Sequence, residues 1–216
     1  GAKVGIFDAD VYGPSLPTMV KTEDSLVMEE SNIKPLEVDG VKLMSFGYTQ
    51  DQGGEGPAIL RGPMVSKIVS QFLLGTAWGE LDYLILDLPP GTGDIQITLC
   101  QIVPITAAVI VTTPQHISFI DVVKGIEMFD TLNVPVVGVV ENMSYFEDHS
   151  TKQKHYPFGN GALRRLHADF GFENTVALPL ESEISSGGDH GRPFIEYFPE
   201  AKSTELLLAF SDQVVR

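Results

Sequence analysis

Runs of apolar and β-branched residues alternate with helical patterns along the 216-residue chain. The runs are nearly continuous, which is typical of strands that are covered on both faces. Strands are predicted at residues 4–7, 83–88, 107–113 and 136–140, and helices at residues 63–78, 96–103, 117–132, 163–170 and 204–215. Strands that alternate with helices indicate parallel pairing with right-handed crossovers. The predicted fold class is therefore α/β, with a mostly parallel sheet, helices on both faces, and a single domain over residues 1–216.

Two local patterns refine this prediction. Residues 33–38 and 42–46 flank Asp39-Gly40, a turn pair that favours a small β-hairpin at one edge of the sheet. In the helix predicted over residues 117–132, the apolar residues indicate one buried stripe. That stripe comprises Ile117, Ile120, Val123, Ile126, Met128 and Phe129.

Charge and hydropathy exclude several classes of partner. The chain has 29 acidic against 14 basic residues and a net charge of −15, whereas nucleic acids and anionic membranes bind basic surfaces. It contains no run of about 20 apolar residues, the length that a membrane-spanning helix needs. We therefore expect neither a nucleic-acid nor a membrane partner. The single cysteine, Cys100, excludes an internal disulfide.

Carboxylates follow two of the predicted strands. Asp8 and Asp10 come after the first run, and Asp87 ends the run LILD, just before PPGTGD at residues 89–94. Ligands of open α/β sheets bind beyond the carboxyl ends of the strands. An aspartate after a buried strand can hold Mg²⁺ through water beside a nucleotide phosphate, and glycines let backbone amides approach that phosphate. The alternative is that these acids are turn or helix-capping residues, above all Asp94.

Several segments, in this order, closely resemble the Mrp-type nucleotide-binding proteins. They are IFDADVYGPSLP, RGPMVSK, LILDLPPGTGDIQITL, VTTPQ, VVENMSYF and GGDHGRPF, and they cover essentially the whole chain. These proteins are deviant P-loop ATPases, related to MinD and ParA, that carry iron–sulfur clusters. The segments TLCQIVPITAAVIVTTPQ and YPFGNG are most similar to the plastid high-chlorophyll-fluorescence branch, which assembles or transfers 4Fe–4S clusters.

The resemblance implies ATP and Mg²⁺ as ligands and gives individual residues roles. Asp10 is implied to activate the attacking water, Asp8 to lie near magnesium and its waters, and Asp87 to be the magnesium partner through water. The implied γ-phosphate sensors are Gly91, Thr92, Gly93 and Asp94. Asn142 is implied to read the adenine base, and its alternative is an ordinary turn residue.

The phosphate-binding loop of this family is not found in the chain. The family has an earlier strand, the loop Gly-Lys-Gly-Gly-x-Gly-Lys-Ser and a helix, whereas no Gly-Lys dipeptide occurs here. We therefore expect a chain that starts at the family's second core strand, lacks the central strand of the sheet, and is not by itself a competent ATPase.

The cluster ligands of the family are also incomplete. Many relatives carry Cys-x-x-Cys after ENMSYF, where this chain reads EDHSTKQKHYPFG. His149 and His155 of that segment could ligate a metal, although a solvated loop is the alternative. Cys100 is either a cluster ligand or a buried structural thiol. Because two chains offer two thiols and a 4Fe–4S cluster needs four ligands, other segments or partners would have to supply the rest.

The predicted function is ATP-dependent assembly and transfer of iron–sulfur clusters by a homodimer that delivers them to apo iron–sulfur acceptor proteins. The resemblance implies the plastid stroma, or the cytoplasm for a bacterial protein. One alternative is a MinD/ParA-like positioning ATPase, but the C-terminal segment STELLLAFSDQVVR has one base and two acids rather than a basic face. The other is a non-catalytic interaction module of the same fold.

Overall fold

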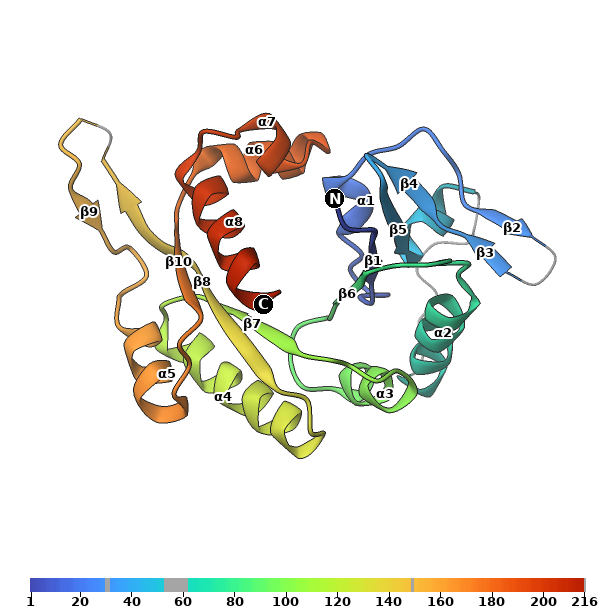
Figure 1. Ribbon diagram of the computed structural model, residues 1–216, viewed down its shortest axis with the longest axis horizontal. Coiled ribbons are helices and arrows are strands. Elements are labelled where there is room, and N and C mark those ends of the chain that lie inside the picture. Colours follow the sequence, from blue (N-terminus) through green and yellow to red (C-terminus); the bar gives the residue numbers. More distant parts are fainter. Residues whose placement is uncertain (30–31, 53–61, 149, 216) are drawn as a thin grey trace. The chain divides into compact units, whose positions relative to one another are not determined.

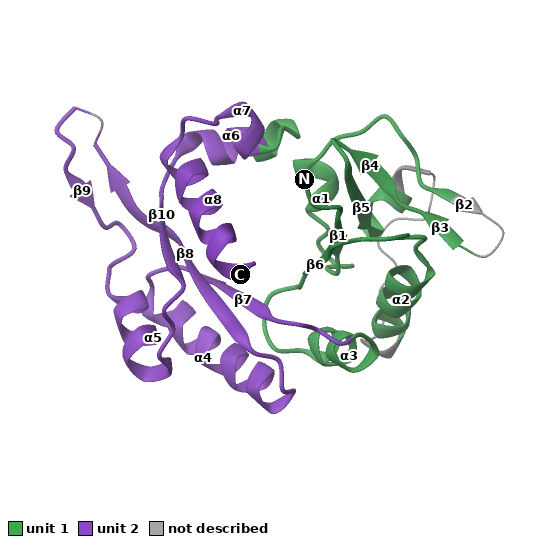
Figure 2. Cartoon of the chain, in the orientation of Figure 1, with its two compact units in different colours: residues 1–103, 188–193 green, residues 104–187, 194–216 purple. Residues whose placement is uncertain are grey.

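The computed structural model describes residues 1–29, 32–52, 62–148 and 150–215. The chain divides into two compact units, which Figure 2 colours separately. Unit 1 comprises Gly1–Val103 and Gly188–Pro193, and unit 2 comprises Pro104–Gly187 and Phe194–Arg216. Strands and helices alternate in both units, so the α/β class is confirmed. The strands form separate sheets in the two units, and the single domain stays a prediction.

The sheet of unit 1 has the strand order β4-β5-β1-β6 (Figure 1). Its strands are β1 (Val4–Asp8), β4 (Leu36–Val38), β5 (Val41–Ser45) and β6 (Tyr83–Asp87). β1 lies parallel to β5 and β6, and this register places Asp8 opposite both Ser45 and Asp87. The carboxyl ends of three strands therefore meet at one edge of the sheet.

The predicted hairpin is confirmed at the edge of this sheet. β4 pairs with β5 in antiparallel orientation, and both turn residues have positive φ, 51° at Asp39 and 78° at Gly40. Positive φ at both central residues is what a two-residue type I′ turn requires, and the twist of that turn matches the twist of the two strands that it joins. The hairpin is shorter than predicted, because Ile33 lies in β3 (Asn32–Lys34), which pairs with β2 (Val27–Glu29) in a separate two-stranded sheet.

Helices complete unit 1. They are α1 (Leu16–Met19), the 3₁₀ helix η1 (Phe46–Gln52), α2 (Gly62–Gly75) and α3 (Asp94–Ile102). In α2, Val65, Val69 and Leu73 recur every fourth residue, so they share one face and are buried. They belong to the core that contains Phe7 and Met44. Each such side chain contributes about 1.5–3 kcal/mol on burial.

β6 differs from the prediction that the strands are covered on both faces. Tyr83, Leu84 and Ile85 are 43%, 37% and 53% exposed. The reason is position, because within the described residues β6 pairs only with β1 and is an edge strand. Its apolar sequence, by contrast, is that of an interior strand.

The sheet of unit 2 has the order β10-β8-β7, with all three strands parallel. Its strands are β7 (Ala108–Thr112), β8 (Val136–Glu147) and β10 (Thr175–Pro179). β8 is longer than predicted because its far end pairs antiparallel with β9 (Lys154–His155). β10 was not predicted, although its residues Val176, Ala177 and Leu178 are apolar.

Helices lie on both faces of this second sheet (Figure 1). Those that pack on the strands are α4 (His116–Thr131), α5 (Ala162–Phe170) and α8 (Lys202–Val214). After β10 the chain forms α6 (Ser182–His190), whose last three residues belong to unit 1, and α7 (Phe194–Tyr197). α8 packs Phe210 against Val140 and Val176 of the sheet. Among the described residues, no helix is both long and apolar enough to cross a membrane.

The predicted apolar stripe of α4 is confirmed at Ile126 and Phe129 and wrong at Ile117 and Ile120. The buried residues of this helix are Phe119, Val122, Ile126 and Phe129. Ile117 and Ile120 are instead 71% and 45% exposed. At 3.6 residues per turn the four buried residues cluster within about a quarter of the helix circumference, whereas the predicted set spreads over about three quarters of it.

Candidate functional site

Asp8 is the most deeply buried of the predicted site residues, at 3% exposure. Its Oδ2 accepts hydrogen bonds from the Ser45 hydroxyl at 2.9 Å and from the Leu16 amide at 3.3 Å. Its Oδ1 accepts from the Asp10 amide at 3.1 Å. A buried carboxylate needs such donors. Asp8 therefore joins the ends of β1 and β5 to the loop that follows.

Asp10 lies on that loop and is half-buried. Its Oδ1 accepts hydrogen bonds from the amides of Tyr12 at 3.1 Å and Gly13 at 3.0 Å. These two bonds fix the carboxylate over the turn that leads to α1, in the manner of an Asx turn. Asp10 is thus held in place by its own loop, at the same edge of the sheet as Asp8.

Asp87 ends β6 directly opposite Asp8, and its backbone carbonyl accepts a hydrogen bond from the Ala9 amide at 2.9 Å. Although the residue is exposed, neighbouring protein atoms displace part of its hydration and raise its pKa. Repulsion from the carboxylates of Asp8 and Asp10 raises this pKa further. Three acids therefore interact at the carboxyl ends of β1 and β6, as the sequence predicts.

This donor set fits a hard cation. Mg²⁺ is bound in proteins through one or two carboxylates together with water and substrate phosphates. A cation at the carboxylates of Asp8, Asp10 and Asp87 would relieve the repulsion that raises the Asp87 pKa. Among the described residues, no group of three or more His, Cys, Asp or Glu side chains could hold a metal ion by itself. The arrangement therefore suits binding through water rather than a closed protein cage.

A buried glutamine that the sequence analysis did not single out shapes the loop after β6. Gln96 of α3 is 2% exposed. Its Nε2 donates to the carbonyls of Pro89 at 2.7 Å and Gly91 at 3.0 Å, and its Oε1 accepts from the Gly93 amide at 3.0 Å. The signal was present, because a Gln three residues after a helix N-cap is half of a capping box.

The glycines of this loop have different roles. Gly91 has a φ of 92°, which side chains other than glycine rarely tolerate. Gly93 is the N-cap of α3, and Asp94 is its first helical residue. The alternative in which Asp94 caps the helix is therefore wrong, and its charge instead lies in the first turn, where it interacts favourably with the helix dipole. Thr92 is exposed between the two glycines.

The two candidate cluster ligands among the described residues, Cys100 and His155, belong to different units. Cys100 is half-buried in α3, and burial raises the pKa of its thiol. A raised pKa disfavours the thiolate, which is the form that binds metal. His155 is exposed on β9, at the end of unit 2 that carries the β8–β9 hairpin, and His149 lies outside the described residues.

Asn142 lies in β8 of unit 2, so its proximity to the carboxylates of unit 1 stays a prediction. Its Oδ1 accepts a hydrogen bond from the Met143 amide at 2.9 Å, and Met143 has a φ of 53°. The preceding Glu141 is 4% exposed and accepts hydrogen bonds from the Ser144 hydroxyl at 2.5 Å and the Leu163 amide at 3.3 Å. Glu141, which the sequence analysis also missed, therefore joins β8 beside Asn142 to the first turn of α5.

Comparison with known proteins gives matches over nearly the whole chain. The family model described as the NUBPL iron-transfer P-loop NTPase matches residues 1–215. The chain is 55% identical over 196 residues to the chloroplastic Fe-S cluster assembly factor HCF101 of Arabidopsis thaliana, covering 89% of this chain and 36% of that protein. It is 43% identical to the iron-sulfur cluster carrier protein of Aquifex aeolicus, covering 98% of this chain and 58% of that protein. The chain thus spans about a third to three fifths of the length of these two relatives.

Solved structures agree with these matches. A nucleotide-binding protein of Archaeoglobus fulgidus in complex with ADP has 35% identity and a TM-score of 0.75, covering 92% of this chain and 80% of that chain. The septum site-determining protein MinD of Pyrococcus horikoshii, with Mg-ADP, has a TM-score of 0.64 over 99% of this chain and 84% of that chain. Its identity of 16% indicates a shared fold and no more.

Proposed function

Because the chain belongs to the family of NUBPL iron-transfer P-loop NTPases, we propose that it is the nucleotide-binding part of an ATP-dependent iron–sulfur cluster carrier. The observation that carries this proposal is the cluster of three aspartates at the ends of β1 and β6. It lies beside the glycine-containing loop after β6, which Gln96 holds by hydrogen bonds. The named relatives are iron–sulfur assembly and carrier proteins, and one structural relative was solved with ADP.

The proposed substrate is Mg-ATP. Asp87 holds Mg²⁺ through water, with Asp8 near those waters, and the ion neutralises charge on the phosphates. Asp10, which its loop fixes at this edge, positions and activates the attacking water. Gly91, Thr92, Gly93 and Asp94 face the γ-phosphate, and Asn142 reads the adenine.

The exposed edge of β6 suggests where the phosphate-binding loop belongs. Tyr83, Leu84 and Ile85 have an interior sequence at an edge position. Exposed apolar edge strands are sites for the addition of another strand. We place there the family's strand that leads to the lysine-bearing loop, so that the loop would reach the carboxyl ends of β1 and β6.

The proposed cargo is a 4Fe–4S cluster that a homodimer passes to apo iron–sulfur acceptor proteins. Two copies of this chain offer only two thiols, so the remaining ligands come from other segments of the full-length protein or from partners. The chloroplastic relatives make the plastid stroma the proposed location. Likeness to MinD in fold alone gives no support to a positioning ATPase.

The test is ATP hydrolysis by the full-length protein and its Asp10→Asn variant. The amide keeps the hydrogen bonds to Tyr12 and Gly13 but is a far weaker base, so turnover should fall by about 10²–10⁴-fold while Mg-ATP binding stays within about threefold. The matched control is Asp82→Asn, an exposed acid that precedes the opposite end of β6 and accepts a hydrogen bond from the Lys3 amide. Wild-type turnover by Asp10→Asn would refute the assignment of the base.

A further inference from the structure

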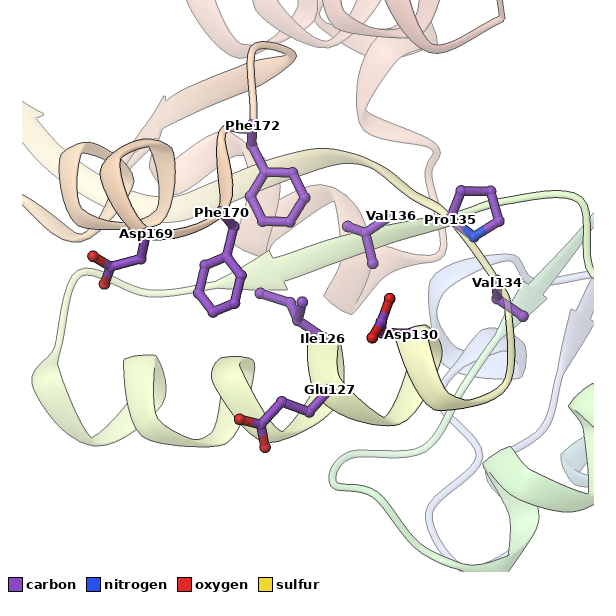
Figure 3. Close-up of a pocket in the computed structure, with 9 residues that line it drawn as sticks. All are labelled: Ile126, Glu127, Asp130, Val134, Pro135, Val136, Asp169, Phe170 and Phe172. Carbon is purple, nitrogen blue, oxygen red and sulfur yellow. The ribbon is translucent and has the colours of Figure 1, made fainter.

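Unit 2 contains a cavity that the proposed nucleotide site does not use. Its volume is about 450 Å³, within the range of small ligand sites, which is about 300–1,000 Å³. The residues around it come from the end of α4, the segment that leads into β8, and the end of α5 with the loop that follows it (Figure 3).

The cavity lies away from the carboxyl end of the strand. β8 begins at Val136, and Asn142 follows six residues later, which is about 20 Å along an extended strand. A ligand in this cavity would therefore leave the surroundings of Asn142 unobstructed.

The floor of the cavity is apolar and partly aromatic. Ile126 is buried, and Val136 lies half-buried across from it. The rings of Phe170 and Phe172 are stacked, with centroids 5.8 Å apart and an interplanar angle of 23°. Phe170 is nevertheless 37% exposed, so aromatic surface remains open to a ligand. Such a floor suits a hydrocarbon stem or a flat delocalised cation.

The charges around this floor all have one sign. Glu127, Asp130 and Asp169 are exposed acids, and among the described residues no base lines the cavity. In Figure 3 the Asp130 carboxylate lies beside the last turn of α4 near Ile126, while those of Glu127 and Asp169 lie further out. The last turns of α4 and α5 also end here, and helix C-termini carry partial negative charge. Phosphates and nucleotides are therefore disfavoured, and cations are favoured.

The same residues argue against a bare metal ion. No group of three or more His, Cys, Asp or Glu side chains in the described ranges could hold one, and this includes the three acids of the cavity. A cation with an apolar stem can pack that stem on the aromatic floor and place its charge beside the three acids. Arginine fits better than lysine, because its planar guanidinium stacks on aromatic rings and binds carboxylates with two parallel hydrogen bonds.

We propose that this cavity of unit 2 binds an arginine side chain of a basic polypeptide segment from a partner protein. The guanidinium stacks against Phe170 and contacts Asp130, and the neighbouring residues of the segment lie along Glu127 and Asp169. Charge complementarity favours a basic protein partner, because the chain carries a net charge of −15 and would attract such a segment from a distance.

The test titrates the ¹⁵N-labelled chain with the peptide acetyl-Gly-Arg-Gly-Arg-Gly-amide and follows the backbone amides by NMR. We expect saturable shifts at Asp130, Val136 and Phe172. Phe170→Ala and Asp130→Asn should each weaken binding by about fivefold, the scale of one cation–π or charged contact. Asp130 is exposed, so Asp130→Asn should keep the wild-type unfolding midpoint. Phe170→Ala should lower that midpoint, because the ring is only 37% exposed and stacks on Phe172, so its binding is measured where the variant is still fully folded. A peptide with lysine in place of arginine should bind more weakly.

The control is Asp212→Asn, which makes the same change of charge on the exposed part of α8. It should leave the affinity within about twofold, the margin expected when only a screened, distant charge is changed. Equal weakening by Asp212→Asn, or shifts spread over the whole surface, would assign binding to diffuse electrostatics and overturn the proposal. Spermine that shifts the same amides, with no preference for the arginine peptide, would assign the cavity to a small polyamine and would also overturn it.

Discussion

Replacing Gln96 by leucine tests whether one buried amide holds the loop between β6 and α3. The leucine side chain is apolar and of similar size, so the change removes three hydrogen bonds and creates little cavity. The bonds join Gln96 to the carbonyls of Pro89 and Gly91 and to the amide of Gly93. A net value of about 1 kcal/mol for each bond gives about 3 kcal/mol. Water can reach the exposed Gly91 and Gly93, so we expect a loss of about 2–3 kcal/mol.

Urea unfolding followed by the fluorescence of Trp78 measures this loss. Trp78 is the only tryptophan of the chain, and it lies in unit 1, where its indole donates to the Leu73 carbonyl. The matched control is Gln101→Leu, the same substitution at an exposed position of the same helix. We expect the control to change stability by less than about 0.5 kcal/mol.

Hydrogen exchange distinguishes local disruption of the loop between β6 and α3 from destabilisation of the whole unit. The Gly93 amide should exchange slowly in the wild type and rapidly in Gln96→Leu. The amides in the middle of α3 should remain protected from exchange in both proteins. If Gln96→Leu is as stable as Gln101→Leu, or if Gly93 exchanges at the wild-type rate, then Gln96 does not hold the loop.

Two further predictions concern Asp87 and Cys100. The raised pKa of Asp87 means that the folded state binds its proton more tightly than the unfolded state does, so this group lowers stability as pH rises from the unfolded pKa, about 3.9, through the folded one. Asp87→Asn should therefore be more stable than the wild type at pH 7 but not at pH 3, as measured by urea unfolding. An equal difference in unfolding free energy between variant and wild type at the two pH values would contradict this prediction. Cys100→Ser in the full-length protein should keep the reconstituted iron–sulfur cluster and lose about 1 kcal/mol, whereas loss of iron and sulfide from a folded variant would make Cys100 a ligand.

The sequence alone predicted that carboxylates meet at the ends of β1 and β6. A run of buried residues followed by an acid indicates where a strand ends, and parallel strands bring their carboxyl ends to one edge. Asp8, Asp10 and Asp87 could therefore be grouped from the strand pattern, and the fold brings them close enough for their charges to interact. The type I′-like turn at Asp39 and Gly40 was predictable for a similar reason, because the turn depends on two adjacent residues.

Other features depended on contacts that no local pattern records. Which face of α4 is buried was decided by the sheet it covers, so Phe119 and Val122 lie inside while Ile117 is exposed. β6 has an interior sequence but an edge position, because the pairing partner of a strand is set by the rest of the sheet.

The sequence by itself determined the α/β alternation, the acids at the strand ends and the glycines of the loop, because each follows from a short run of neighbouring residues. Only the tertiary structure determined the three hydrogen bonds of Gln96, the burial of Glu141 and the cavity that Phe170 lines. These features join residues from separate elements. The physical reason is that hydrogen-bond partners and cavity walls are chosen by packing in three dimensions, whereas sequence patterns report only the periodicity of each element.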